Sequence, residues 1–299
     1  MKPFKIKIQL LFLLTLSFQL TAYCQQGRVL ESLAMESDLL EGKVKYSVYL
    51  PPDYDKSERS YPVLYLLHGY SGNETVWIQF GEVNRIADNA IKEGEVSSFI
   101  IIIPDGKTSW YCNDYQGLEP YEDMFIREFI PFIEKQYRIR PKKEFRAIAG
   151  NSMGGYGALK FAMKYNHLFS TCVAFSSGIF TDEEIANMPD SIYGILDGIY
   201  GKNLKGNERV NDNWKNNSPL YLAKTIPVDK LKSVRFYLDC GDDDFLNSGN
   251  SDLHNLMRDL KIPHEYRVRD GAHNWKYWSD GLPAGLSFIN KSFIREIGF

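Results

Sequence analysis

One serine in the chain lies in a pattern that would make it a nucleophile. Residues 150–154 have the sequence G-N-S-M-G, in which Ser152 stands two residues from a glycine on either side. An apolar run over 145–149 predicts a strand before this motif, and a helical pattern over 154–165 follows it. A G-x-S-x-G motif at a strand–helix junction is typical of a nucleophile elbow, a tight turn that exposes the serine hydroxyl at a helix N-terminus. We therefore expect Ser152 to attack an electrophilic carbon.

A serine hydroxyl is a weak nucleophile and needs a base, commonly a histidine that a carboxylate orients. Where the serine follows a strand in this way, the chain order is serine, acid, histidine. His273 lies in the loop 269–275, between the last predicted strand and the last predicted helix, and is the expected base. Four histidines fit less well, because they precede the serine, end its helix, fall inside a predicted helix or begin a strand: His68, His167, His254 and His264, respectively.

The carboxylate must lie between the serine and the histidine, at the carboxyl end of a strand. The apolar segment 234–238 leads into a turn rich in aspartates. Asp244 comes directly before two apolar residues, so it is the aspartate that we expect to be turned inward. Asp242 and Asp243 remain alternatives, although solvent or local turn hydrogen bonds could satisfy both. The cluster lacks the alternating ligands and closing glutamate of an EF-hand, and we predict no metal site there.

The oxyanion formed in such a reaction needs two backbone N–H donors. We expect one from Met153, the residue after the nucleophile, and one from Tyr70, in the loop that follows the apolar run 62–67. His68 is expected to brace this loop by hydrogen bonding. Four aromatic residues near loop ends are candidates for lining a substrate pocket, although each could equally pack in the core: Trp110, Tyr111, Trp275 and Trp278.

The segments that must position these residues alternate between strands and helices. Apolar or alternating segments predict strands at 44–50, 62–67, 99–104, 145–149, 171–175, 234–238 and 265–268. Helical patterns occur at 83–92, 121–137, 154–165, 251–260 and 282–297. This alternation predicts one α/β domain with a mostly parallel sheet and helices on both faces. The polar, Asn-rich segment 181–222 breaks the rhythm and predicts a small lid-like insertion over the active site.

Composition excludes several classes of protein. The chain has 299 residues, of which 44% are hydrophobic and 24% charged, and these proportions exclude a disordered, collagen-like or coiled-coil protein. The formal net charge is −3, and no basic run stands out in the body of the chain, which argues against nucleic-acid binding. Aromatic residues make up 14% of the chain, enough for both a large core and an aromatic pocket.

The first 24 residues have the pattern of a secretory signal peptide. Lysines at positions 2, 5 and 7 precede an apolar stretch over 10–20 that is short for a bilayer span. We therefore predict an exported protein, periplasmic or extracellular, with residues 25–299 as a single domain and no membrane span after cleavage. Lipid anchoring at Cys24 is an alternative that Tyr23 disfavours, because lipoprotein signals prefer a small residue at that position.

Three cysteines remain in the predicted mature chain, so it can hold at most one internal disulfide. Cys172 and Cys240 lie in or beside strand-like runs, and we expect both to be buried as small hydrophobic side chains. The role of Cys112 stays open. The three positions lack the paired spacing of a zinc site.

These motifs together resemble the putative-esterase (esterase D-like) family of α/β hydrolases, which includes feruloyl and acetylxylan esterases and tributyrin-type esterases. The matching segments span nearly the whole predicted mature chain in the family's order, at 49–52, 66–69, 150–155, 240–246 and 271–275. The resemblance implies the α/β-hydrolase fold and favours Asp244 as the acid, because Asp-Phe-Leu follows Cys-Gly at the family's spacing. Residues 109–111 resemble an active-site loop of tributyrin-type members, although Cys112 stands where a hydroxyl residue is expected.

The resemblance implies a serine esterase that acts through an acyl-enzyme and needs no metal or cofactor. Our hypothesis is an exported enzyme that removes feruloyl or acetyl groups from plant polysaccharide fragments, so its partner would be a small ester or an acylated oligosaccharide. A general short-chain carboxylesterase of the tributyrin type is the alternative. An acyltransferase fits less well, because no large lipid groove is evident. A non-catalytic carbohydrate-binding protein also fits less well, because the candidate triad is intact. The sequence predicts no oligomeric state.

Overall fold

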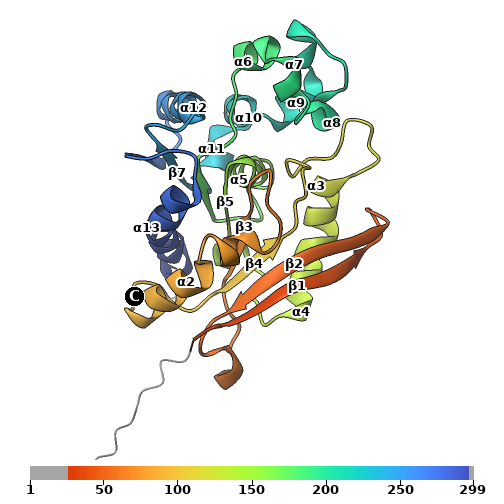
Figure 1. Ribbon diagram of the computed structural model, residues 1–299. Coiled ribbons are helices and arrows are strands. Elements are labelled where there is room, and N and C mark those ends of the chain that lie inside the picture. Colours follow the sequence, from red (N-terminus) through yellow and green to blue (C-terminus); the bar gives the residue numbers. More distant parts are fainter. Residues whose placement is uncertain (1–25, 296–299) are drawn as a thin grey trace, which may run out of the picture.

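The computed structural model describes residues 26–295, which form an eight-stranded sheet with helices packed on both faces (Figure 1). The strand order is β1-β2-β4-β3-β5-β6-β7-β8. Both pairings of β2 are antiparallel, and the remaining five are parallel. The strands are β1 (Arg28–Ser37), β2 (Gly42–Leu50), β3 (Val63–Leu67), β4 (Ile100–Pro104), β5 (Arg146–Asn151), β6 (Thr171–Phe175), β7 (Arg235–Gly241) and β8 (His264–Arg269). The predicted mostly parallel α/β architecture is confirmed.

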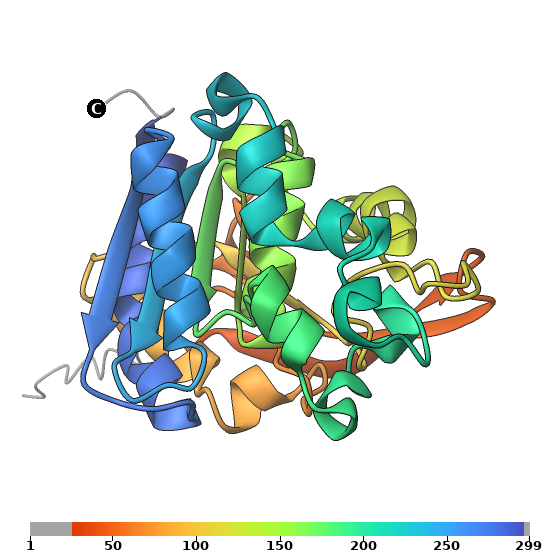
Figure 2. The same cartoon turned by 90° about the horizontal axis from the view of Figure 1, so that it is seen from above.

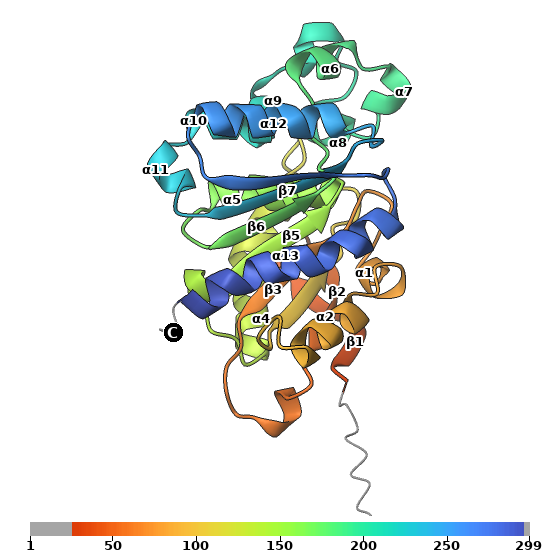
Figure 3. The ribbon, with the colours of Figure 1, turned by 90° about the vertical axis from the view of Figure 1, so that its left-hand side faces the viewer.

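Central strands are continuous apolar runs because both of their faces are covered. Every residue of β3, β4, β5 and β6 is buried. Alternate side chains enter two separate cores. One core lies under α1 (Val76–Gln79), α2 (Val83–Lys92) and α13 (Trp275–Arg295), and the other under α3 (Tyr121–Met124), α4 (Ile130–Gln136), α5 (Met153–Lys164), α11 (Val228–Leu231) and α12 (Asn247–Asp259). Figure 3 shows α13 and α2 on one side of the sheet and α12 with α5 on the other.

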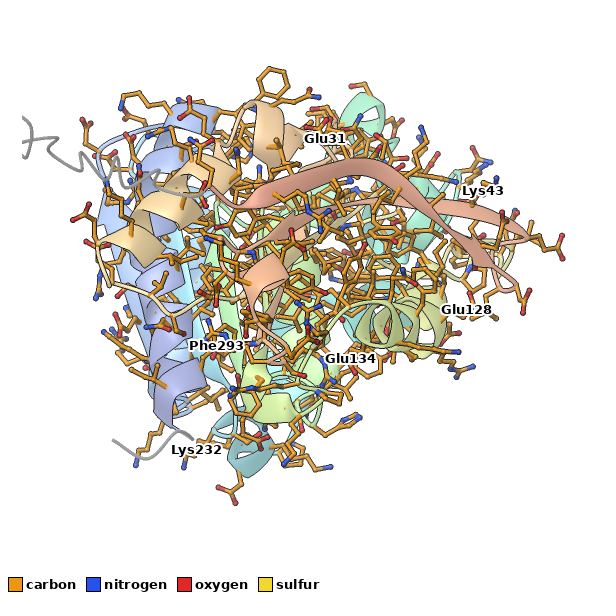
Figure 4. The ribbon with its side chains drawn as sticks, turned by 90° about the horizontal axis from the view of Figure 1, so that it is seen from below. Glu31, Lys43, Glu128, Glu134, Lys232 and Phe293 are labelled. Atoms are coloured by element: carbon orange, nitrogen blue, oxygen red, sulfur yellow. The ribbon has the colours of Figure 1, made fainter. Side chains whose placement is uncertain are left out.

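β1 is the strand that the sequence pattern did not predict. It is an edge strand, so most of its residues are exposed or only partly buried. A bulge between Leu30 and Leu33 breaks its alternation, and Ser32 has a φ of 53° there. The hairpin that β1 forms with β2 is tied to the domain by Glu128, whose carboxylate accepts hydrogen bonds from the Ser37 hydroxyl and the Leu39 N–H. Figure 4 shows Glu128 and Lys43 toward the same end of this hairpin.

Helix boundaries differ from the sequence pattern in three places, one of which is α12, which begins four residues before the predicted start at 251. The predicted helix over 121–137 contains a π-helical segment, Phe125–Phe129, between α3 and α4. Pro131 in the first turn of α4 has no N–H to donate. The Ile130 N–H before it donates to the carbonyl of Phe125, five residues earlier, which is the hydrogen bond of a π-helix. α13 begins at Trp275, seven residues before the predicted start at 282, and continues past Pro283.

The Asn-rich segment 181–222 folds into short helices beside the main helix layer (Figures 1 and 2). Its members are α6 (Asp182–Asn187), α7 (Asp190–Tyr193), α8 (Asp197–Tyr200), α9 (Asp212–Asn217) and α10 (Pro219–Thr225). Arg209 is buried among them, donates to the carbonyls of Leu204 and Met188, and pairs with Asp190. Side chains such as Trp214 join the same core cluster as the sheet, so the segment packs continuously with the α5 side of the domain.

The proposed signal peptide and Cys24 lie outside the described residues. Within residues 26–295 no helix combines the length and apolar character needed to cross a membrane. Cys112, Cys172 and Cys240 are all buried free thiols, which confirms the expectation for Cys172 and Cys240 and leaves no disulfide in the described part of the chain. Burial raises the pKa of all three thiols, that of Cys240 to about 12.

Candidate active site

Ser152 stands in a strained turn between β5 and α5. Its backbone has φ 56° and ψ −120°, a conformation that costs a non-glycine residue about 1–3 kcal/mol and persists only where the surroundings enforce it. The Ser152 N–H donates to the Phe175 carbonyl at 2.9 Å, and its own carbonyl accepts from the N–H groups of Tyr156 and Gly178. These hydrogen bonds fix the turn, so the Ser152 side chain is presented at the N-terminus of α5.

Close backbone approach explains the two flanking glycines. A Cβ on Gly150 would lie 2.4 Å from the backbone of Gly154, and a Cβ on Gly154 would lie 2.3 Å from the Leu67 carbonyl oxygen. Both distances are far below van der Waals contact, and the obstructing atoms are backbone atoms that cannot move aside. The motif spacing is therefore a packing requirement of the turn where β3, β5 and α5 meet.

His273 bridges Ser152 and Asp244. Its Nε2 lies 3.0 Å from Ser152 Oγ, and its Nδ1 lies 2.9 and 3.1 Å from the two carboxylate oxygens of Asp244. An ionised carboxylate can only accept, so Nδ1 carries the proton and Nε2 presents its lone pair to the serine hydroxyl. The side chain of Asp244 is fully buried, whereas that of His273 is 18% exposed. The imidazole is thus fixed on one edge and open to the pocket on the other.

Hydrogen bonds keep Asp244 ionised despite its burial. Burial alone would raise the pKa of this carboxyl, but hydrogen bonds from His273, from the Leu246 N–H and from the Ser176 hydroxyl hold it below its ordinary value. Trp278 supports the same corner, because its indole N–H donates to Ser176 Oγ at 3.0 Å and its ring meets the His273 imidazole edge-on at 4.9 Å. The negative charge needed to orient an imidazole is therefore permanent at neutral pH.

The two alternative aspartates face solvent. Asp242 accepts hydrogen bonds from the N–H groups of Gly271 and Asp243, and within residues 26–295 the hydrogen bonds of the His273 ring go to Asp244 and Ser152 and to neither of these aspartates. Their carboxylates and that of Asp270 lie within 4.8 Å of one another, and all three are exposed. Of the three acids weighed from the sequence, the structure brings only Asp244 to the histidine.

The two backbone N–H groups proposed for the oxyanion, those of Met153 and Tyr70, lie on segments next to Ser152. Among the described residues no protein group accepts from the N–H of Met153 or of Tyr70. The Tyr70 loop lies against the nucleophile, since a Cβ on Gly69 would lie 3.3 Å from Ser152 Cβ. His68 is buried, donates from Nδ1 to the Gly69 carbonyl and accepts at Nε2 from the Gly106 N–H. This histidine therefore braces the loop and is in no position to exchange protons with substrate.

A pocket of about 550 Å³ opens above Ser152 and His273. Three of the four aromatic residues proposed from the sequence line it, namely Trp110, Trp275 and Trp278. Tyr111 does not, which corrects that expectation. Trp110 and Tyr111 have φ values of 52° and 57°, and this double left-handed turn sends the Tyr111 ring into the core, where its hydroxyl donates to the His68 carbonyl.

Four further pocket residues were not proposed from the sequence. Phe80, Phe180, Ile195 and Phe245 line the pocket, and Phe80 and Phe245 are 57% and 76% exposed. Only Phe245 had a usable signal, since it directly follows the proposed acid in sequence. Apart from His273, the pocket lining contains no ionisable side chain of the aspartate, glutamate, lysine or arginine type. The pocket therefore suits a neutral, largely apolar ligand.

A buried ion-pair cluster holds the Trp110–Tyr111 turn against α5. Lys160 is fully buried and donates to the Tyr111 carbonyl at 2.6 Å and to Glu122 at 2.5 Å, while Lys164 pairs with the other oxygen of Glu122. Burial would raise the pKa of Glu122, but the two lysines lower it to about 2. Glu122 is consequently charged at any pH near neutrality, and it depends on Lys160 for compensation.

Replacing Lys160 by methionine is expected to lower the free energy of unfolding by about 3 kcal/mol, because it leaves a buried carboxylate only partly paired. Lys164→Met is the matched control, one turn along the same helix and paired with the same carboxylate. The Lys164 side chain is 27% exposed, so its loss should cost about 1 kcal/mol or less. Urea unfolding of both variants checks the difference, and equal losses would contradict the burial argument.

Comparison with known proteins identifies relatives of the whole domain. The family model described as "Putative esterase" matches residues 37–289. An acetyl esterase of Caldicellulosiruptor saccharolyticus is 28% identical over 250 residues, which cover 79% of this chain and 86% of that protein. An endo-1,4-beta-xylanase/feruloyl esterase of Xylanibacter ruminicola is 35% identical over 163 residues, 52% of this chain and 22% of that much longer protein.

Solved structures give the same relationship. A ferulic acid esterase superimposes with a TM-score of 0.77 at 33% identity, covering 90% of this chain and 99% of that one. An S-formylglutathione hydrolase from Agrobacterium tumefaciens superimposes with a TM-score of 0.71 at 19% identity, covering 90% of this chain and 96% of that one, which is a likeness of fold alone.

Proposed function

This chain belongs to the putative-esterase family of α/β hydrolases, and we propose on that premise that it cleaves carboxylic esters with Ser152, His273 and Asp244 as its catalytic triad. The carrying observation is the continuous hydrogen-bonded path from Ser152 Oγ through both nitrogens of His273 to the buried Asp244 carboxylate. An unoriented serine would not react with an ester at a useful rate, whereas this arrangement supplies both a base and its fixed tautomer.

Acylation begins when Ser152 Oγ attacks the ester carbonyl carbon and His273 Nε2 takes the hydroxyl proton. The carbonyl oxygen becomes an oxyanion, which the N–H groups of Met153 and Tyr70 are free to bind. The charged imidazole is stabilised by Asp244. When the tetrahedral intermediate collapses, the bond to the alcohol oxygen breaks and His273 returns its proton to that oxygen, which leaves an acyl-Ser152 ester.

Deacylation repeats these steps with water. His273 Nε2 accepts a proton from a water molecule as the water oxygen attacks the acyl carbon, and the same two N–H groups bind the second oxyanion. Collapse breaks the acyl–Ser152 bond, and the serine oxygen regains its proton from His273. The carboxylic acid is released and the enzyme returns to its starting state. The residues described here supply every group that this cycle requires.

For the substrate, we propose feruloyl or acetyl esters of plant polysaccharide fragments. Two features support this choice: relatives named acetyl esterase and feruloyl esterase, and a pocket lined by aromatic and other uncharged residues. A general short-chain carboxylesterase is the second candidate, favoured by the mostly apolar lining. S-Formylglutathione fits less well, because the pocket lining offers no lysine or arginine for the carboxylates of glutathione. Export through residues 1–24 stays a prediction.

Product release from acylated arabinoxylan oligosaccharides tests this proposal. Feruloylated and acetylated oligosaccharides are compared with p-nitrophenyl butyrate, with Ser152→Ala as the inactive control. We expect rapid release of ferulate or acetate from the oligosaccharides and a lower kcat/KM on the butyrate. Activity on the butyrate alone would leave a general carboxylesterase, and a wild-type enzyme silent on every ester would refute the esterase assignment.

A further inference from the structure

The tetrahedral intermediate divides the pocket into two sides. Its four substituents are Ser152 Oγ, the oxyanion, the alcohol oxygen and the acyl chain. The oxyanion lies at the N–H groups of Met153 and Tyr70, and the alcohol oxygen must lie within hydrogen-bond reach of His273 Nε2 to receive its proton. The acyl chain takes the remaining direction. Residues on the His273 side of the pocket must therefore contact the alcohol, and those on the opposite side must contact the acyl chain.

Aromatic contacts separate the pocket lining along the same division. A continuous row of rings includes His273, with Phe245 4.7 Å and Trp278 4.9 Å away, and continues through Trp275, 5.2 Å from Trp278, to Phe80, 6.0 Å from Trp275. We call this set, Phe80, Phe245, His273, Trp275 and Trp278, the histidine row. Because it contains the proton donor for the leaving group, this row borders the space through which the alcohol departs.

A second group of lining side chains centres on Trp110, and we assign this group to the acyl side. The Trp110 ring lies 6.3 Å from Tyr70 and 6.4 Å from Phe180, and its indole N–H donates to the Ile195 carbonyl in the 181–222 segment. We call this set, Tyr70, Trp110, Phe180 and Ile195, the tryptophan wall. Throughout residues 26–295 no ring contact joins the tryptophan wall to the histidine row. Trp110 is buried and the other three members are partly buried, so this side is less exposed than Phe80 and Phe245 and suits a defined acyl group.

We propose that Phe80 and Phe245 form an alcohol subsite that binds a sugar ring of the acylated oligosaccharide, an inference that rests on the proposed esterase function. The two side chains are 57% and 76% exposed, an unusual state for phenylalanine, and both stand at the pocket rim. The exposed part of such a ring stays in contact with water in the free protein and can bury apolar surface against a ligand. A small alcohol such as methanol would not reach both rings, whereas a sugar unit linked to further units would extend over the rim.

Charge and surface chemistry agree with a neutral sugar. The lining contains no carboxylate or cationic side chain, so it does not select a charged alcohol. The C–H faces of a pyranose or furanose ring are apolar and pack on aromatic faces, while their hydroxyls stay in water at an open rim. A lipid alcohol would instead need a continuous apolar groove leading away from the rim.

Four single substitutions test this division. Phe80→Ala and Phe245→Ala alter the histidine row, Ile195→Ala alters the tryptophan wall, and Leu118→Ala removes a side chain that is 74% exposed and lies outside the pocket. Each variant is assayed on a feruloylated arabinoxylan oligosaccharide and on methyl ferulate, which carry the same acyl group on different alcohols. The measured quantity is the ratio of kcat/KM on the oligosaccharide to kcat/KM on methyl ferulate, in which any general loss of activity cancels.

Both phenylalanine variants are expected to lower this ratio about fivefold, the size of a partly buried ring contact. Phe80→Trp should keep the ratio close to that of the wild type, because it retains an aromatic face at the rim. Ile195→Ala and Leu118→Ala should leave the ratio within about twofold of wild type. Ile195→Ala should instead change the preference between methyl ferulate and methyl acetate, which differ only in the acyl group.

An unchanged ratio in both phenylalanine variants would overturn the alcohol subsite while leaving the esterase function intact, since methyl ferulate would still be cleaved. The alcohol subsite would also be overturned if Ile195→Ala lowered the ratio as much as Phe80→Ala does, because the two sides of the pocket would then not be separate. A wild-type enzyme that cleaves neither these feruloyl esters nor methyl acetate and acetylated oligosaccharides would refute the proposed function and the subsite together. Activity of the wild type on the methyl esters therefore distinguishes the two failures.

Discussion

The Ser152→Ala variant is expected to lose about 10⁴- to 10⁶-fold in kcat on every ester that the wild type hydrolyses. No other hydroxyl group hydrogen-bonds to His273 Nε2 in the described part of the chain, so no second nucleophile can take over. Residual turnover would come only from the oxyanion donors and from binding. The measurement is steady-state hydrolysis of p-nitrophenyl butyrate, together with a stopped-flow test for the burst of p-nitrophenolate that an accumulating acyl-enzyme gives.

The strained backbone of Ser152 supplies a second arm to this experiment. Ser152→Gly removes the same hydroxyl but also removes the Cβ that makes φ 56° and ψ −120° unfavourable. It should therefore be as inactive as Ser152→Ala, yet more stable than the wild type by about 1 kcal/mol in urea unfolding. An alanine variant that kept more than about a hundredth of wild-type kcat would exclude Ser152 as the nucleophile.

Features whose local packing restricts the residue types could be predicted from the sequence. The serine turn is one, because Gly150 and Gly154 leave no room for a side chain and so produce a recognisable spacing. Buried parallel strands are another, since both faces are covered and the whole run must be apolar. The α/β fold and the strands from β3 to β7 followed from these patterns, and all seven predicted strands, β2 to β8, are confirmed.

Features that depend on distant contacts could not be predicted in this way. β1 is an edge strand with a bulge, so neither burial nor alternation marks it clearly. The inward turn of Tyr111 depends on Lys160, 49 residues away. The Lys160 ammonium donates a hydrogen bond to the Tyr111 carbonyl and so stabilises two consecutive left-handed residues. The pocket likewise combines Phe80, Phe180 and Phe245 from three separate segments, and no local pattern relates them.

The aspartate turn contains both a feature that the sequence could predict and one that it could not. Sequence position alone left Asp242, Asp243 and Asp244 as candidates, since all three follow the same strand. Their difference is one of direction: the Asp244 carboxylate points into the protein and accepts from the Leu246 N–H, while Asp242 points outward and accepts from the Gly271 N–H. That direction depends on how the β7 turn packs against the histidine loop, which spacing within the turn does not reveal.

Asp244→Asn is expected to lower kcat about 10³- to 10⁴-fold with little change in fold. The amide is nearly the same size as the carboxylate, but it is neutral and presents an NH₂ group that can donate toward His273. The imidazole can then turn its lone pair to that NH₂ group and carry its proton on Nε2, where it no longer acts as a base toward Ser152. The loss of the negative charge also removes the stabilisation of the imidazolium formed during attack.

Asp242→Asn and Asp243→Asn are the matched controls, because they make the same change in charge within the same turn. Both side chains are exposed and neither touches His273, so each variant should keep kcat within about twofold of wild type. Measurement of kcat on p-nitrophenyl butyrate for the three variants separates two explanations of the effect. A large loss confined to Asp244→Asn requires the buried hydrogen bond to His273 Nδ1. Comparable losses in all three would mean that the summed negative charge of the turn, rather than that one contact, supports the imidazole.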